Sequence, residues 1–100
     1  MSMFSHPGEL KIPPSAKDDG RAQEIIRIWS TGGQQEFAIK HDAWADPAAW
    51  GLLLVDVARH VSRAFHERGR DKDEVYQRIL QGFRAEAERP TDEPTGGIQK

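Results

Sequence analysis

The apolar residues of this chain are concentrated in a central stretch between Ile25 and Phe83, and two polar tails flank that stretch. A segment of this size is near the lower limit at which a single hydrophobic core stabilises a fold. The chain contains no cysteine, so neither a disulfide nor a thiolate-bound metal can add stability. The sequence therefore predicts one small domain over residues 24–89, with self-association as the simplest source of further burial.

Charge and hydropathy argue against several classes of protein. The 100 residues carry a formal net charge of −2, with a pI near 6.1, whereas nucleic-acid-binding domains are usually strongly basic. No apolar run approaches the roughly 18 residues that a membrane-spanning helix needs. The first ten residues lack the basic start and apolar region of a secretory signal. We therefore expect a cytoplasmic protein that binds neither nucleic acid nor membrane and needs no cofactor.

Two runs rich in β-branched and aromatic residues predict an antiparallel hairpin over residues 24–41. Between them lie Gly32 and Gly33, which supply the positive φ values that a tight loop requires. The set predicted to face the helices comprises Ile26, Ile28, Phe37 and Ile39. Ile25 and Trp29 are then left on the opposite face.

Two helices are predicted next, over residues 46–68 and 71–88. Asp46-Pro47 is typical of a helix start, and Gly69 of a left-handed helix stop. Asp71 followed by Glu74 resembles a capping box for the second helix. The first helix carries one apolar stripe, made of Trp50, Leu53, Leu54, Val57, Val61, Ala64 and Phe65. Leu52 and Val55 fall outside this stripe and indicate a second buried surface.

The predicted fold is therefore α+β, an antiparallel β-hairpin packed against two antiparallel helices. A short third strand near residues 10–12 would extend the hairpin. The prolines and glycines of residues 1–23 predict an extended arm, and residues 90–100 predict a flexible tail. Because a two-stranded sheet is marginal alone, we expect a symmetric homodimer. Its interface candidates are Ile25, Trp29, Leu52 and Val55.

Several segments together resemble a known family. They are residues 46–60 (DPAAWGLLLVDVARH), residues 10–14 (LKIPP), residues 83–86 (FRAE) and residues 90–92 (PTD). They are similar to a family of short bacterial proteins, mostly alphaproteobacterial, that is described only as a domain of unknown function. The resemblance covers roughly residues 9–96, and residues 46–60 are its most specific part. It implies one complete domain and transfers no activity.

Asp56 and His60 are the best-placed pair for chemistry. They are four residues apart on one predicted helix, so their side chains can meet. A carboxylate beside an imidazole fixes its tautomer and raises its basicity, as a general base requires. A pair with this spacing can equally form a hydrogen bond whose role is purely structural, on the surface of the helix. We favour the structural interpretation, because the chain has no cysteine and Ser62 points away from His60.

A second candidate is the basic face of the same helix, formed by Arg59, Arg63 and His66. These side chains can hold a phosphate, a carboxylate or an acidic protein partner. They also lie near a helix C-terminus, where positive charge is favoured without any ligand. A metal site is not expected. The available ligands are His41, Asp42, Asp56, His60 and His66, and only one pair of them shares a helix face, whereas a structural zinc needs four.

Two functions remain open. The favoured one is a small non-enzymatic homodimer that binds a protein partner through its apolar surface and its basic patch. The alternative is a small-ligand-binding or enzymatic site around Asp56 and His60. An enclosed pocket around this pair would favour the alternative, and exposure of the pair beside an apolar groove would favour the interaction protein.

Overall fold

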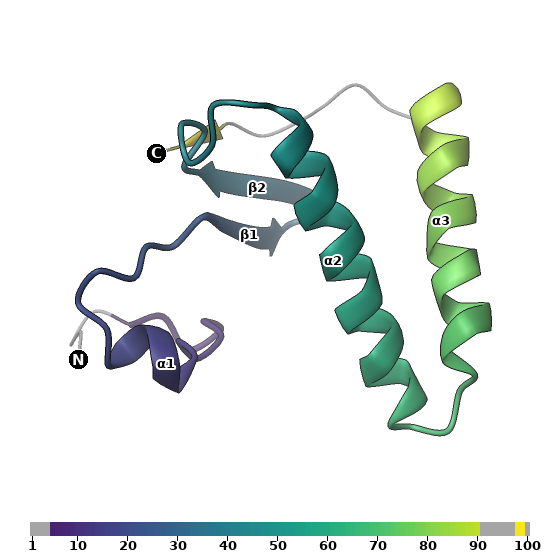
Figure 1. The fold of residues 1–100 in the computed structure, drawn as a ribbon, viewed down its shortest axis with the longest axis horizontal. Coiled ribbons are helices and arrows are strands. Elements are labelled where there is room, and N and C mark those ends of the chain that lie inside the picture. Colours follow the sequence, from purple (N-terminus) through teal and green to yellow (C-terminus); the bar gives the residue numbers. More distant parts are fainter. Residues whose placement is uncertain (1–4, 91–97, 100) are drawn as a thin grey trace.

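The computed structural model describes residues 5–90 and 98–99. Its elements, in order, are α1 (Pro14–Lys17), β1 (Ile26–Thr31), β2 (Gln34–Ile39), α2 (Ala48–His66), α3 (Lys72–Glu88) and β3 (Ile98–Gln99). Figure 1 shows the β-hairpin beside the first half of α2, while the turn that joins α2 to α3 lies far from the sheet. The predicted α+β class and the antiparallel hairpin are confirmed.

The sheet has the strand order β1-β2-β3. β1 and β2 are antiparallel, with Ile28 opposite Phe37 and Thr31 opposite Gln34. Gly32 and Gly33 form the loop with φ values of 53° and 88°, the pair of left-handed conformations that a two-residue hairpin turn uses. β3 runs parallel to β2 on its other side. Within the described residues, β1 is therefore an edge strand.

The third strand is not where the sequence predicted it. Residues 10–12 have no regular secondary structure, and the added strand comes instead from Ile98–Gln99. Two prolines follow Ile12 directly and remove the backbone donors that a sheet ladder needs. The arm is also less extended than predicted, because Pro14 begins the short helix α1, where no donor is required. Of the predicted tail, residues 91–97 and 100 lie outside the described residues.

Local signals explain the ends of α2 and α3. The Asp46 carboxylate accepts a hydrogen bond from the Ala48 amide at 3.0 Å, as expected of an N-cap. At the other end Gly69 adopts φ 93°, and the amides of Gly69 and Arg70 donate to the carbonyls of His66 and Phe65. This pair of bonds is a Schellman motif. The Asp71 carboxylate then caps α3 by accepting from the amides of its second and third residues, at 2.9 and 3.1 Å.

The two helices pack through small residues rather than through the predicted apolar stripe. Within residues 5–90 the buried side chains are Ala58 and Ser62 on α2 and Val75 on α3. The Ser62 hydroxyl donates to the Ala58 carbonyl at 2.8 Å, so this polar group is satisfied inside the contact. Large side chains of the stripe point elsewhere and stay exposed, among them Leu54, Val57 and Val61.

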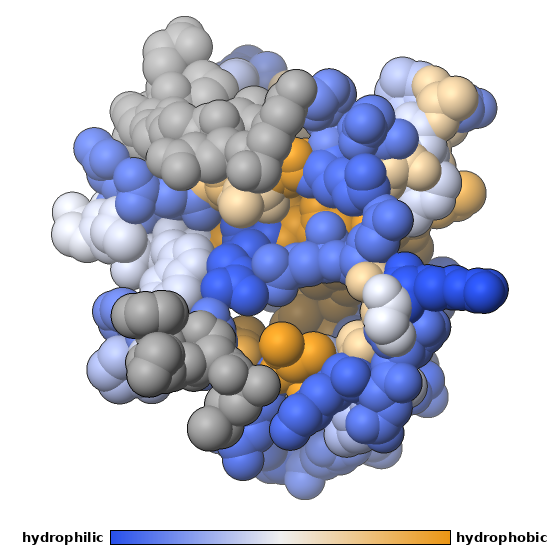
Figure 2. All heavy atoms as spheres, turned by 90° about the vertical axis from the view of Figure 1, so that its left-hand side faces the viewer, coloured by the Kyte–Doolittle hydropathy of each residue, from blue (hydrophilic) through white to orange (hydrophobic). Residues whose placement is uncertain are grey.

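A single chain buries very little. The described elements that contact each other are β1 with β2, β2 with β3, and α2 with α3, so the helices lie beside the hairpin without closing a filled core over it. The chain exposes 9164 Å², whereas a compact monomer of this mass exposes about 5,700 Å². Figure 2 shows apolar surface inside a hollow with a hydrophilic rim. Over the described residues, no helix is long and apolar enough to cross a membrane.

Candidate functional site

α2 carries the candidate residues, and its three sides have different surroundings. Successive helix residues are about 100° apart, so residues 58 and 62 mark the side that faces α3. One flanking side is the apolar stripe described above. The remaining side holds Leu52 and Val55 together with the three candidates of the basic face, Arg59, Arg63 and His66. Leu52, Val55 and the basic candidates thus lie on a side of α2 that is distinct from both the α3 side and the stripe.

Asp56 and His60 are close together and open to solvent. The His60 Nδ1 atom lies 3.5 Å from the Asp56 carboxylate, and the two side chains are 69% and 65% exposed. A shorter contact of 2.8 Å joins the same Nδ1 atom to the Asp56 backbone carbonyl. Because a carbonyl can only accept, this bond requires a hydrogen on Nδ1 and leaves Nε2 free. The His60 ring therefore lies on the open surface of α2 rather than under a neighbouring element.

The basic candidates are placed on one side of α2 but do not converge on a single point. The Arg59 guanidinium lies over the Tyr76 ring of α3, 4.8 Å from its centre, which holds the side chain against the helical hairpin. His66 uses its Nδ1 atom in a 3.1 Å contact with the Arg70 carbonyl at the end of the helix. Arg63 lies between these two residues in sequence and is exposed.

An apolar groove runs beside Asp56. It has a volume of about 520 Å³ and is lined by Trp44, Ala49, Leu52, Leu53, Val55, Asp56 and Arg59. Trp44 forms its end by packing edge-to-face on Trp50, with 5.2 Å between ring centres, in the manner of a hydrophobic staple at a helix start. Leu52 is 74% exposed on this side. The groove is open and shallow, with one carboxylate and one guanidinium on its rim.

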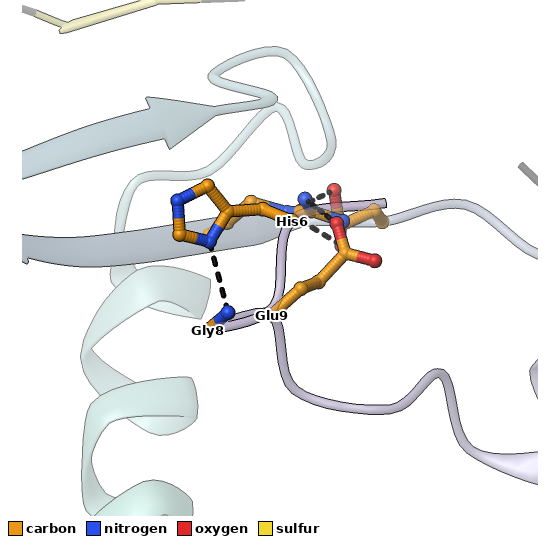
Figure 3. A network of polar contacts seen from close by, with 5 residues as sticks. His6, Gly8 and Glu9 are labelled. Atoms are coloured by element: carbon orange, nitrogen blue, oxygen red, sulfur yellow. Dashed lines mark hydrogen bonds and ion pairs between the residues drawn. The ribbon is translucent and has the colours of Figure 1, made fainter. Parts of the chain in front are cut away.

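The other two interface candidates, Ile25 and Trp29, are half-buried. The N-terminal arm covers part of Trp29, because the His6 ring meets it edge-to-face at 4.9 Å. His6 is held in turn by the Gly8 amide, which donates to Nδ1 at 2.9 Å (Figure 3). These two candidates are therefore shielded within one chain more than Leu52 and Val55 are.

An ion pair fastens the same arm to β1. Arg27 Nη1 lies 2.7 Å from Glu9 Oε2, and its other nitrogens bond Glu24. Hydrogen bonds with Glu24 first, and then with Glu9, raise the pKa of Arg27. Sequence reasoning missed this contact because the two partners are eighteen residues apart. The only available signal was a lone arginine at a position between apolar residues on the predicted strand.

The metal ligands considered above do not come together. Within residues 5–90, no three histidine or acidic side chains gather as they would around a metal ion. His41 and Asp42 belong to the turn after β2, and Asp42 forms a pair with Lys40 at 3.2 Å. Asp56 and His60 remain a pair without a third ligand.

Comparison with known proteins identifies a matching family and a similar solved structure. The family model for a domain of unknown function (DUF5076) matches residues 9–91. A solved structure from the photosynthetic bacterium Rhodopseudomonas palustrus CGA009, described as a "putative pyruvate dehydrogenase", is similar with a TM-score of 0.74 and 35% identity. The match covers 97% of this chain and 100% of that one. No curated protein matches the chain.

Proposed function

The chain belongs to the domain of unknown function family DUF5076, and we propose that it is a small, cytoplasmic, non-enzymatic homodimer that binds a protein partner. The observation that carries this proposal is how few apolar side chains the described residues bury. Within residues 5–90 the buried apolar side chains are Ala58 and Val75, while eleven large apolar side chains are exposed. A fold of this kind gains most of its burial by association.

The amount of exposed surface supports a homodimer. The chain exceeds the surface of a compact monomer by about 3,400 Å². An obligate homodimer removes about 2,000–5,000 Å² from its two chains together. The excess on each chain is thus large enough to supply its half of such an interface.

The groove beside Asp56 is the surface we propose for the partner. Its apolar lining of Trp44, Leu52 and Val55 adjoins the basic side of α2, where Arg59 and Arg63 lie. This chemistry fits a segment that presents apolar side chains next to carboxylates. Nucleic acid fits less well, because α3 begins with acidic residues close to the same helix end.

The first test is the solution mass, measured by light scattering over a range of protein concentrations. We expect a mass near twice the 11.3 kDa of one chain, stable down to low micromolar concentration. A mass of 11.3 kDa at every concentration would remove the homodimer from the proposal. The partner surface would then be tested alone, by comparing capture of acidic peptides by the wild type and by an Arg59→Glu, Arg63→Glu variant.

One observation favours the alternative of a small-ligand site: the groove includes both Asp56 and Arg59. The exposure of Asp56 and His60 speaks against catalysis, because a site that excludes water strengthens the electrostatic interactions inside it and this pair is open to water. Pyruvate is the natural probe, given the name of the structural relative. A saturable shift of the His60 ring signals on adding pyruvate, with His6 unchanged, would support the ligand site. Unchanged signals at both rings would support the interaction protein.

A further inference from the structure

We propose that the second copy of this chain binds along the apolar stripe of α2 formed by Leu54, Val57, Val61 and Phe65, with the two α2 helices antiparallel. This inference rests on the homodimer proposed above and assigns the surface that holds it. The side of α2 that carries Leu52, Val55 and the basic residues is then left free for the partner.

The stripe is a continuous row that no other helix or strand of the described residues covers. Its four side chains are spaced by three and four residues, and they are 48%, 47%, 39% and 40% exposed in chain order. The small residues Ala58 and Ser62 hold α3 on a neighbouring side, so α3 cannot cover the row. Rows of this spacing pack into the grooves of a similar helix. Two α2–α3 hairpins joined this way form a four-helix arrangement.

A second copy fits the stripe better than an unrelated protein does. The excess of about 3,400 Å² is present on every chain, and a two-fold interface covers the same patch on both chains at once. One such interface therefore removes the exposed row from each protomer without needing any other molecule. Monomeric proteins rarely keep a contiguous apolar row of this kind in water.

The helix dipoles determine the orientation of the two helices. Each α2 helix carries partial positive charge at its N-terminus, which Asp46 caps, and partial negative charge at its C-terminus. Antiparallel packing places the N-terminus of each helix beside the C-terminus of the other, so the two dipoles attract each other. Parallel packing would bring like ends together. The two-fold axis then passes between Val57 and Val61, near the middle of the stripe.

The decisive variant is Val61→Glu, with Leu52→Glu as its matched control. Both changes place a carboxylate at an exposed position on the same helix, but on different sides of it. We expect the dimer dissociation constant, measured by sedimentation over a concentration series, to rise at least tenfold for Val61→Glu. We expect Leu52→Glu to remain a dimer like the wild type.

The outcomes separate the two proposals. A monomeric wild type removes the homodimer itself, and this interface with it. A dimeric wild type whose pairing survives Val61→Glu, but is lost on Leu52→Glu, overturns the assignment of the stripe and leaves the homodimer standing.

Cross-linking provides a test that does not depend on a destabilising change. Because the sequence has no cysteine, single substitutions Val57→Cys and Val61→Cys introduce the only thiol in each chain. Antiparallel packing places residue 57 beside residue 61 of the second copy, within disulfide reach. With one variant labelled with ¹⁵N, mild oxidation of the mixture should give mainly labelled–unlabelled dimers. Links within the Val57→Cys variant alone would overturn the antiparallel arrangement. Rapid disulfide formation between two Leu52→Cys chains, with no disulfide in the mixture of Val57→Cys and Val61→Cys, would overturn the assignment of the stripe as the interface.

Discussion

Lys40 and Asp42 form an exposed ion pair in the turn that leads from β2 to α2. The hydrogen bond and positive charge of the Lys40 ammonium lower the pKa of the Asp42 carboxyl. Because the folded pKa lies below the unfolded one, the pair stabilises the fold at pH values above the unfolded pKa. This contribution is lost as the pH falls through the folded pKa.

We expect Lys40→Ala to raise the pKa of Asp42 back toward its ordinary value, because the favourable partner of the carboxylate is removed. The measurement is an NMR pH titration of the side-chain carboxyl signals. Lys11→Ala, on the N-terminal arm, serves as the control and should leave the Asp42 titration unchanged. An identical Asp42 pKa in the wild type and in Lys40→Ala would show that the pair does not persist in solution.

At the same scale, Asp56 and His60 show what spacing on a helix can and cannot predict. Their proximity followed from their separation of four residues, and the 3.5 Å distance agrees with it. Their exposure could not be predicted, because it depends on which neighbouring element covers that side of α2. Whether such a pair can do chemistry depends more on whether a neighbouring element covers it than on the distance between its two side chains.

At the scale of elements, the contact between α2 and α3 depends on small side chains. We expect Ala58→Leu to cost about 1–3 kcal/mol of unfolding free energy, because a larger side chain forces the helices apart. Ala87→Leu, at an exposed position of α3, should change it by less than about 0.5 kcal/mol. Urea unfolding of both variants at one protein concentration measures the difference. Equal stability would show that the two helices do not pack closely through Ala58.

Elements with local signals were predictable from the sequence. The Gly32-Gly33 turn, the Asp71 cap and the Gly69 stop each act within a few residues, and each was found where expected. The side of α2 that meets α3 was missed, since the periodicity of large apolar residues points to the stripe and gives no weight to Ala58 and Ser62. β3 was missed for a different reason, because its pairing with β2 joins segments about sixty residues apart.

At the scale of the whole molecule, association and folding are coupled on the proposed homodimer. A hundredfold increase in protein concentration should then raise the unfolding free energy by about 2.7 kcal per mole of dimer, because mass action favours the paired state. The urea midpoint measured by circular dichroism at 1 and 100 µM would show this as an upward shift. Coincident unfolding curves at the two concentrations would mean that a single chain holds the fold by itself.

The scarcity of buried side chains in one chain has a consequence for how the cell maintains this protein. On the proposed homodimer, a chain that shields so little of itself is a ready substrate for proteases until it meets a second copy. Below the dissociation constant, the amount of paired protein falls with the square of the number of chains made. On this proposal, the amount of assembled protein falls more steeply than the amount of the message that encodes it.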